Sequence, residues 1–460
     1  MFVTSSCRRD DLALSLLGIL IVALILCGLA LHRPGAPSVG SIPLVNGFVA
    51  LLAAAGLVFL LACSLVLRRP PGRGTGRRTL LIVLVVAALM RAGPLLAPPF
   101  LSSDLYRYVW DGRVQRAGIN PYRFIPADAA LSALRDEAIY PHVNRRDYAP
   151  TIYPPVAQLL FRAVASVSQT ALAMKSAAVL MECLAIACLV STLRHAGLPA
   201  ARVLLYAWNP LAAWTFAGNG HVDAAAVGFL ALALLLRVRG QDGWSGVALG
   251  AAVLVKFIPA AVVPAFWRWR WRFPAALVAT MVLLYLPFLD VGWRRAFGFL
   301  GAYGGEEGLR DGSGIWLLAG LTRLGPLPPA ATSIYLLLSA LGLAALALAT
   351  GLSRHPGNSS GAAVSVAARA GCLAAAVFLV LSPHYPWYFP WLGLFAALAP
   401  AFSLLWLSVA PLVLYLDPWH EFFIWPSLVY VPAILLAAID IRRGILPFGT
   451  TGTPTGSLPA

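Results

Sequence analysis

Long apolar segments separated by short polar ones are the dominant pattern of this chain. Runs of about 20 apolar residues recur from one end to the other, and each is long enough to cross a hydrocarbon core of about 30 Å. The pattern predicts membrane-spanning helices at 12–31, 43–67, 79–97, 172–193, 200–217, 222–238, 273–290, 331–352, 364–382, 387–400, 402–416 and 424–440. The expected fold is therefore an all-α integral membrane protein, a polytopic helical bundle.

Two further apolar segments do not fit a simple crossing. Residues 153–168 are short and open with two prolines, which favours an interfacial or re-entrant helix. Residues 243–266 are interrupted by Lys256 and Pro259, so we expect a hairpin that enters and leaves on one side. With these pieces, the chain is expected to have about 12–14 transmembrane or re-entrant helices.

The arginines predict the orientation of these helices. The linker at 68–78 is rich in arginine, and such loops stay in the cytoplasm. Both chain termini are then cytoplasmic, and the long polar stretch at 98–152 becomes a large first outer loop. The net charge of +16 is explained by this topology, so no nucleic-acid partner is expected.

The pattern divides the chain into four parts. These are three N-terminal transmembrane helices at 1–97, an extracytoplasmic catalytic loop with interfacial helices at 98–168, a transmembrane core at 169–445 and a disordered cytoplasmic tail at 446–460. The first apolar run is too long for a signal peptide and shows no small-residue cleavage site, so we expect it to be retained.

Composition excludes a soluble globule. Hydrophobic residues make up 60% of the chain and charged residues 11%, with a mean hydropathy of +0.80, whereas soluble domains carry about 25% charged residues. The six cysteines suggest neither a disulfide framework nor a metal site. No P-loop, dinucleotide fingerprint, HExxH or nucleophile elbow is present, so no cofactor is expected and a divalent metal is not indicated.

The densest group of functional residue types is the run 102–113, directly after the third predicted span. It is expected to form a helix with Ser103 or Asp104 as N-cap and Gly112 at its end. In that helix Asp104, Tyr108 and Asp111 share one face, and about 10 Å separates the two carboxylates along the axis.

This helix face could carry chemistry. A carboxylate there could take a proton from a sugar hydroxyl, while Arg107 beside it neutralises a phosphate. Arg113 is a further binding candidate on the same helix. The alternative is that Asp104 only caps the helix and that the other residues form a solvated face.

Aromatic residues and prolines form two turns that bracket the outer loop, at 118–122 and 153–155. Asn120, Tyr122 and Tyr153 are candidates for contact with a sugar ring, because tyrosine offers a flat face and proline fixes the backbone. The alternative is that these tyrosines anchor the chain at the membrane interface.

Other candidates follow further along the chain. His221 and Asp223 lie at an outer helix start, where Asp223 either caps the helix or holds a ligand hydroxyl. Lys256 in an apolar run either snorkels to the inner surface or binds an anion such as lipid phosphate. The remaining candidates in outer segments are Arg310, His384 and Tyr385.

Taken together, these motifs resemble the polyprenyl-phosphate-mannose-dependent branch of the GT-C glycosyltransferases, in particular glycosyltransferase family 87 and related bacterial mannosyltransferases. The likeness rests on the segments 104–113, 118–122, 151–155, 208–210, 221–223, 256–259 and 384–388. Two features depart from the superfamily: a pair of helices precedes the segment that is usually first, and there is no soluble C-terminal domain.

The resemblance implies a GT-C-like bundle in the inner (plasma) membrane of a bacterium. It implies that a hexose, mannose first of all, moves with inversion from a polyprenyl-phosphate sugar to a glycan or lipid acceptor on the extracytoplasmic face. Asp104 would be the catalytic base, with Asp111 as the second candidate. Arg107 or Arg310 would stabilise the phosphate leaving group without a metal.

The main alternative is a transporter or flippase for lipid-linked sugars, which would also need many helices and buried charge. Transporters keep their polar residues near the bilayer midplane. Here the polar residues gather in one outer loop, which favours an enzyme that works at the membrane surface. Membrane lipids are expected as further partners. The acceptor, the hexose, the linkage and the oligomeric state do not follow from the sequence.

Overall fold

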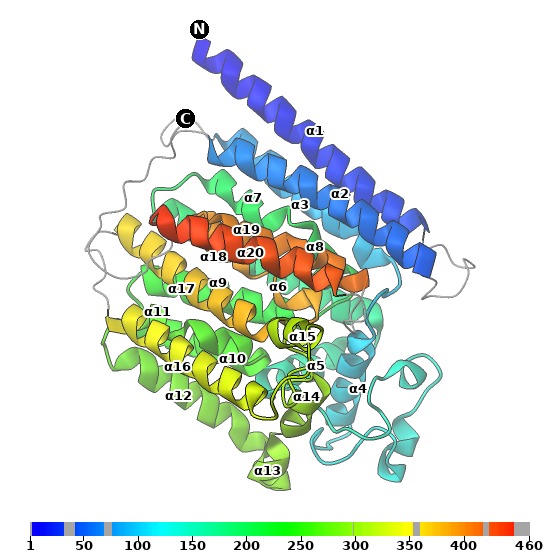
Figure 1. The fold of residues 1–460 in the computed structure, drawn as a ribbon. Coiled ribbons are helices and arrows are strands. Elements are labelled where there is room, and N and C mark those ends of the chain that lie inside the picture. Colours follow the sequence, from blue (N-terminus) through cyan, green and yellow to red (C-terminus); the bar gives the residue numbers. More distant parts are fainter. Residues whose placement is uncertain are drawn as a thin grey trace.

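The computed structural model describes residues 2–31, 42–68, 76–297, 299–352, 359–416 and 423–445. These ranges are helical, with no β-strand among them, as Figure 1 shows. The all-α prediction is confirmed. The predicted disordered tail at 446–460 and residues 69–75 of the predicted linker lie outside the described residues.

Eight helices in the described ranges are long and apolar enough to cross a membrane, and each coincides with a predicted span. They are α1 (Phe2–Leu31), α2 (Ile42–Leu67), α3 (Arg77–Leu96), α6 (Ala171–His195), α12 (Arg272–Tyr285) with its continuation η6 (Leu286–Val291), α16 (Ala331–Leu352), α17 (Ser359–Leu381) and α20 (Ile424–Arg442). The chain is therefore a polytopic membrane protein.

Four other predicted spans are shorter or broken. They form η3 (Ala200–Val203), α7 (Leu204–Ala207), α8 (Pro210–Ala213) and η4 (Trp214–Gly218), then α9 (Asp223–Val238), then η7 (Pro386–Tyr388) and α18 (Leu392–Leu398), and finally α19 (Phe402–Val409) and η8 (Ala410–Leu416). The first break has a local cause, because Pro210 cannot donate to the preceding turn. Asn209 caps α8 there and donates to the carbonyl of Ser408 at 2.7 Å.

The segment predicted as a hairpin folds back on itself. It contains α10 (Asp242–Val255), η5 (Ile258–Val262) and α11 (Val263–Phe266). Its two ends meet, because Arg270 contacts Asp242 at 3.4 Å. Lys256 lies at the tip and pairs with Asp223 at the start of α9, so the alternative in which its side chain snorkels away from other residues is not observed.

The outer-loop segment begins with α4 (Asp104–Arg116), η1 (Ala129–Leu134) and η2 (Tyr140–His142) and leads into α5 (Pro155–Val167). The predicted end of the first helix at Gly112 is wrong, because α4 continues to Arg116. Gly112 instead lies where α4 meets α5, and a Cβ there would lie 2.4 Å from the carbonyl oxygen of Phe161. Glycine at this position therefore permits close helix contact.

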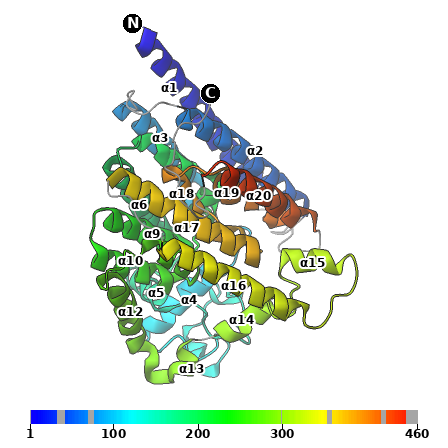
Figure 2. The ribbon, with the colours of Figure 1, turned by 60° about the vertical axis from the view of Figure 1, so that its left-hand side comes forward.

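The helices form a bundle with one elaborated end. α1 and α2 lie side by side along one edge, and α6, α9, α10 and α12 pack in series in the body (Figure 1). In Figures 1 and 2, α4 lies with α13 (Trp293–Ala296) and α14 (Leu300–Glu306) at the end opposite the start of α1, while α15 (Trp316–Thr322) projects beside them.

Candidate active site

Asp104 lies in the first turn of α4 and points into the bundle end. Its side chain is 17% exposed, and one carboxylate oxygen accepts a hydrogen bond from the Asn144 amide at 2.6 Å. The other oxygen lies 3.6 Å from Nδ1 of His221. The N-cap of α4 is Ser103, so the alternative that Asp104 serves as the cap is not observed. Asp104 is therefore mostly buried, and one of its carboxylate oxygens makes no hydrogen bond within the described residues.

Lys256 is a charged residue close to Asp104. Its Nζ donates to both carboxylate oxygens of Asp223, at 2.8 and 2.9 Å, across the gap between the hairpin tip and α9. The ammonium also lies 4.0 Å from the centre of the Tyr388 ring, whose hydroxyl lies 3.0 Å from that of Tyr303. The ammonium of Lys256 is thus held between the Asp223 carboxylate and the Tyr388 ring.

His221 lies next to Asp104 as a neutral ring. The side chain is fully buried, and neither ring nitrogen makes a hydrogen bond within the described residues. Burial, reinforced by the charge of Lys256, holds the pKa of His221 well below its usual range. The ring stacks on Trp387 with centroids 4.1 Å apart. His221 therefore packs beside Asp104 and does not neutralise the carboxylate.

An aromatic wall continues from His221 on the side of the 384–388 segment. Tyr385 stacks on Trp387 with centroids 4.6 Å apart, and His384 lies 6.3 Å from Tyr385. Trp387 thus links Tyr385 to His221, while His384 contacts Tyr385. Flat aromatic faces of this kind suit the apolar face of a sugar ring.

Arg145 connects the outer loop to α14. Its Nε donates to Glu306 at 2.6 Å, and its guanidinium lies over the Tyr303 ring at 5.3 Å. The residue has a φ of 52°, a left-handed conformation that is unusual without glycine. Two backbone segments also meet here, because the amide of Phe299 donates to the carbonyl of Thr151 at 3.4 Å. This contact ties the outer loop to the segment that precedes α14.

The electrostatic environment makes Asp104 a stronger base than an exposed aspartate. Burial raises its pKa, although Lys256, Arg145, the Asn144 hydrogen bond and Arg107 oppose the shift. Burial also raises the pKa of Glu307 at the end of α14. A carboxylate with a raised pKa takes up a proton more readily than an ordinary aspartate.

Asp111 is placed quite differently from Asp104. One of its oxygens accepts from Arg107 at 2.9 Å and the other from Gln158 at 3.0 Å, and both Arg107 and Asp111 are almost fully buried. Arg107 also donates to the carbonyls of Ala149 and Asn144. The pair thus holds α4, α5 and the outer loop together, which leaves Asp111 no accessible oxygen for a proton transfer.

We expect Asp111→Asn to reduce stability but not the chemical step. Removing one partner of a buried ion pair leaves the Arg107 charge uncompensated, which costs about 3 kcal/mol. The free energy of unfolding should therefore fall, while transfer per folded molecule stays near the wild-type value. Thermal unfolding in detergent and an activity assay check this, with exposed Asp147→Asn as control. Complete loss of activity in a stably folded Asp111→Asn variant would show that Asp111 takes part in the transfer reaction.

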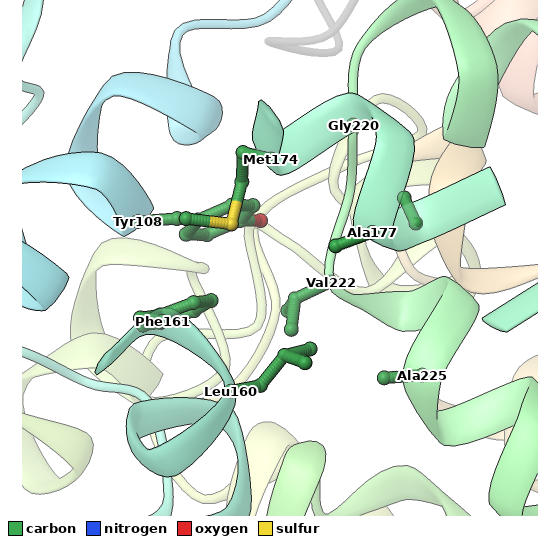
Figure 3. Close-up of a pocket in the computed structure, with 9 residues that line it drawn as sticks. Tyr108, Leu160, Phe161, Met174, Ala177, Gly220, Val222 and Ala225 are labelled. Carbon is green, nitrogen blue, oxygen red and sulfur yellow. The ribbon is translucent and has the colours of Figure 1, made fainter. Parts of the chain in front are cut away.

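Three predicted tyrosines belong to the interior. Tyr108 is 1% exposed and stacks on Phe161 with centroids 4.7 Å apart. Figure 3 shows its ring beside Met174 in a small pocket that is otherwise lined by apolar residues. Tyr153 packs edge-on against Tyr108, and the Tyr122 hydroxyl donates to the Tyr153 carbonyl at 2.6 Å. These rings support α4 and are not placed as sugar platforms.

Three other predicted residues make contacts elsewhere. Arg113 pairs with Asp136 at 2.7 Å, and Asn120 donates to Asp290. Arg310, predicted to bind phosphate, donates to the carbonyl of Gly301 at 2.7 Å and is not among the charges that act on Asp104. These residues brace loops around the site.

Sequence reasoning missed Asn144 and Arg145 and did not single out Tyr303, Trp387 or Tyr388. Asn144 and Arg145 lie in an irregular segment, where neither hydrophobic period nor motif marks them. The three aromatic residues carried a signal, since they lie in or near segments rich in tyrosine and tryptophan, but that signal is shared by membrane anchors.

Within the described ranges, no group of three or more His, Cys, Asp or Glu side chains is arranged to hold a metal ion. The charged residues around Asp104 that could meet an anionic substrate are Lys256 and Arg145. The arrangement therefore offers a base, two cations and an aromatic wall.

A family model for alpha-(1->6)-mannopyranosyltransferases, described as their N-terminal domain, matches residues 13–272. The match covers more than half of the chain and includes Asp104, Arg145, His221, Asp223 and Lys256. The chain belongs to this family. It is therefore a membrane-bound mannosyltransferase, and the resemblance to GT-C mannosyltransferases is confirmed.

The family match also bears on the first two helices. Because it starts within α1, the helices that set this chain apart from other GT-C proteins belong to the matched region. No curated protein and no solved structure was found to match this chain.

Proposed function

We propose that this mannosyltransferase takes mannose from a polyprenyl-phosphate mannose and transfers it, with inversion, to a glycan or lipid acceptor on the extracytoplasmic face of a bacterial inner membrane. Both termini are then cytoplasmic. The observation that carries the proposal is the position of Asp104, a largely buried carboxylate with a raised pKa beside Lys256 and Arg145. A base next to two cations suits a reaction that deprotonates a hydroxyl and expels a phosphate.

Asp104 acts on the acceptor. It accepts the proton of the acceptor hydroxyl while that oxygen attacks the anomeric carbon of the donor. The bond between the anomeric carbon and the phosphate oxygen breaks, and polyprenyl phosphate leaves with the bonding electrons. Asn144 orients the carboxylate through its hydrogen bond, and neutral His221 packs beside it. No cofactor is needed for this displacement.

Lys256 and Arg145 act on the donor phosphate. Lys256 exerts the largest electrostatic effect on Asp104 among its charged neighbours, and Arg145 follows. A monophosphate leaving group carries less charge than a diphosphate, so two cations can stabilise it as it departs. These two residues take the role that the family resemblance implied for Arg107 and Arg310, whose guanidinium groups bind backbone carbonyls.

The family description suggests the stereochemistry and the linkage. An α-linked product formed from a β-linked polyprenyl-phosphate mannose requires inversion, as expected for a single displacement. An α-(1→6) bond requires the primary hydroxyl of a mannose as nucleophile. We therefore propose an acceptor that ends in mannose.

The product and the donor test this proposal together. Purified protein is given labelled polyprenyl-phosphate mannose or GDP-mannose, with a mannose oligosaccharide as acceptor, and the new linkage is assigned by NMR. We expect transfer from the lipid donor alone and an α-(1→6) product. Transfer from GDP-mannose, or a β-linked product, would contradict the proposal.

The pH dependence reports on Asp104. Only the ionised form of Asp104 can accept a proton, so kcat/KM falls as the solution is acidified and the carboxylate becomes protonated. Because the pKa of Asp104 is raised, this fall should begin at a higher pH than it would for an ordinary aspartate. Asn144→Leu removes a hydrogen bond to the charged form, so the pKa rises further and activity is lost at a higher pH as the solution is acidified. Profiles of both proteins from about pH 4 to pH 8 check this. Identical acid limbs would contradict the coupling.

A further inference from the structure

A second charged site lies at the other end of α9. Asp223 begins this helix in the Asp104 site, and Arg237 is fourteen residues further on, which corresponds to about 21 Å along the axis. The Arg237 side chain is 1% exposed, and its Nε donates to the carbonyl of Phe266 at 2.6 Å. One of its terminal nitrogens has no hydrogen-bond partner among the described residues.

Other arginines surround this buried guanidinium. Arg268, Arg369 and Arg270 all lie close enough to repel its charge, and one carboxylate, Asp242, attracts it. Asp242 shares its charge with Arg270, which contacts it at 3.4 Å. Among the described residues, Arg237, Arg268 and Arg270 therefore share the single carboxylate of Asp242, next to a buried donor of Arg237 that lacks a partner.

The chain that follows Phe266 adds a second unsatisfied donor. The indole Nε1 of Trp267 is buried and makes no hydrogen bond within the described part of the protein. Trp269, with a φ of 60°, stacks on Trp267 and donates to the carbonyl of Gly351, while Trp271 is largely exposed. A left-handed turn thus places tryptophans and arginines alternately at the bundle end.

We propose that this cluster of Arg237, Arg268, Arg270, Arg369 and Trp267 binds the phosphate of an anionic membrane lipid. A buried guanidinium with an unmade hydrogen bond is costly, and an anion removes that cost. Exposed tryptophans mark the level of lipid head groups in membrane proteins. Basic pockets between transmembrane helices hold anionic head groups in the same way. The site is independent of the proposed sugar transfer, because it lies at the opposite end of the bundle.

Lipid titration of the purified, delipidated full-length protein tests the proposal. Native mass spectrometry and thermal unfolding compare phosphatidylglycerol, phosphatidylcholine and inorganic phosphate. We expect phosphatidylglycerol alone to bind stoichiometrically and to raise the unfolding temperature. The double variant Arg268→Gln/Arg270→Gln should weaken this binding about thirtyfold, the equivalent of about 2 kcal/mol.

Two comparisons keep the test specific. Arg194→Gln removes an exposed arginine from the same end of the neighbouring helix α6 and should change the affinity less than about threefold. Arg237→Met removes the buried charge and should abolish the lipid-dependent rise even where the variant is stable. Equal losses in Arg194→Gln and the double variant, or full lipid binding by Arg237→Met, would overturn the site. Equal stabilisation by inorganic phosphate would overturn the assignment to a lipid.

Discussion

Asp104→Asn is expected to reduce the rate of mannose transfer about a thousandfold while the protein remains folded. A positioned general base contributes about 10²- to 10⁴-fold, and the amide cannot accept the proton. Asparagine has nearly the same shape, so the neighbours Asn144 and His221 keep their places. The measurement is single-turnover transfer from labelled polyprenyl-phosphate mannose by purified protein.

Stability gives a separate readout for the same substitution. Burial raises the pKa of Asp104, so the folded protein disfavours the charged carboxylate. The free energy of unfolding therefore decreases as the pH rises from the pKa that Asp104 has in the unfolded chain to the higher pKa that it has in the folded protein. A neutral amide removes that cost, and the unfolding temperature near pH 7 should be unchanged or higher. Asp147→Asn serves as control, because that carboxylate is exposed. Near-wild-type transfer by Asp104→Asn would assign the base elsewhere.

Lys256→Met is expected to impair both activity and stability, for different reasons. Transfer should fall about a hundredfold or more, because a cation that stabilises the departing phosphate is lost. Stability should fall by about 3 kcal/mol, because Asp223 is left buried without its partner. Kinetics and thermal unfolding on the same preparation measure the two effects.

A second substitution separates the two roles of Lys256. In the double variant Lys256→Met/Asp223→Asn, no buried charge remains unpaired, so most of the stability should return. Transfer should stay low, because the donor phosphate still lacks its cation. Recovery of transfer together with stability would mean that Lys256 serves only to neutralise Asp223.

The long helices could be predicted from the sequence because length and hydropathy alone decide them. The breaks were harder to predict, because a local signal such as Pro210 acts together with contacts to residues distant in the chain. The span expected at 200–217 is interrupted at Asn209, whose amide binds the carbonyl of Ser408 about 200 residues later. The end of α4 was misjudged for a similar reason, since Gly112 serves a contact with α5 and not a helix terminus.

The site was predicted in part, as separate residues. Sequence patterns selected Asp104, His221, Asp223 and Lys256, but no pattern could show that the hairpin brings Lys256 to Asp223. Helical spacing placed Asp104 and Asp111 on one face and left both as candidates for the base. Burial and partners distinguish them, because Gln158 and Arg107 occupy the oxygens of Asp111. Arg145 was missed because irregular loops carry no periodic signal.

Transfer of labelled mannose by wild-type protein in proteoliposomes tests the central claim most directly. Polyprenyl-phosphate [¹⁴C]mannose is placed in the bilayer with a mannose oligosaccharide outside, and label is counted in the oligosaccharide and in each leaflet. We expect label in the oligosaccharide with wild-type protein, and about a thousandfold slower labelling in vesicles that contain Asp104→Asn. Movement of the intact donor between leaflets, with no labelled oligosaccharide, would contradict the claim and indicate a transporter of lipid-linked sugars.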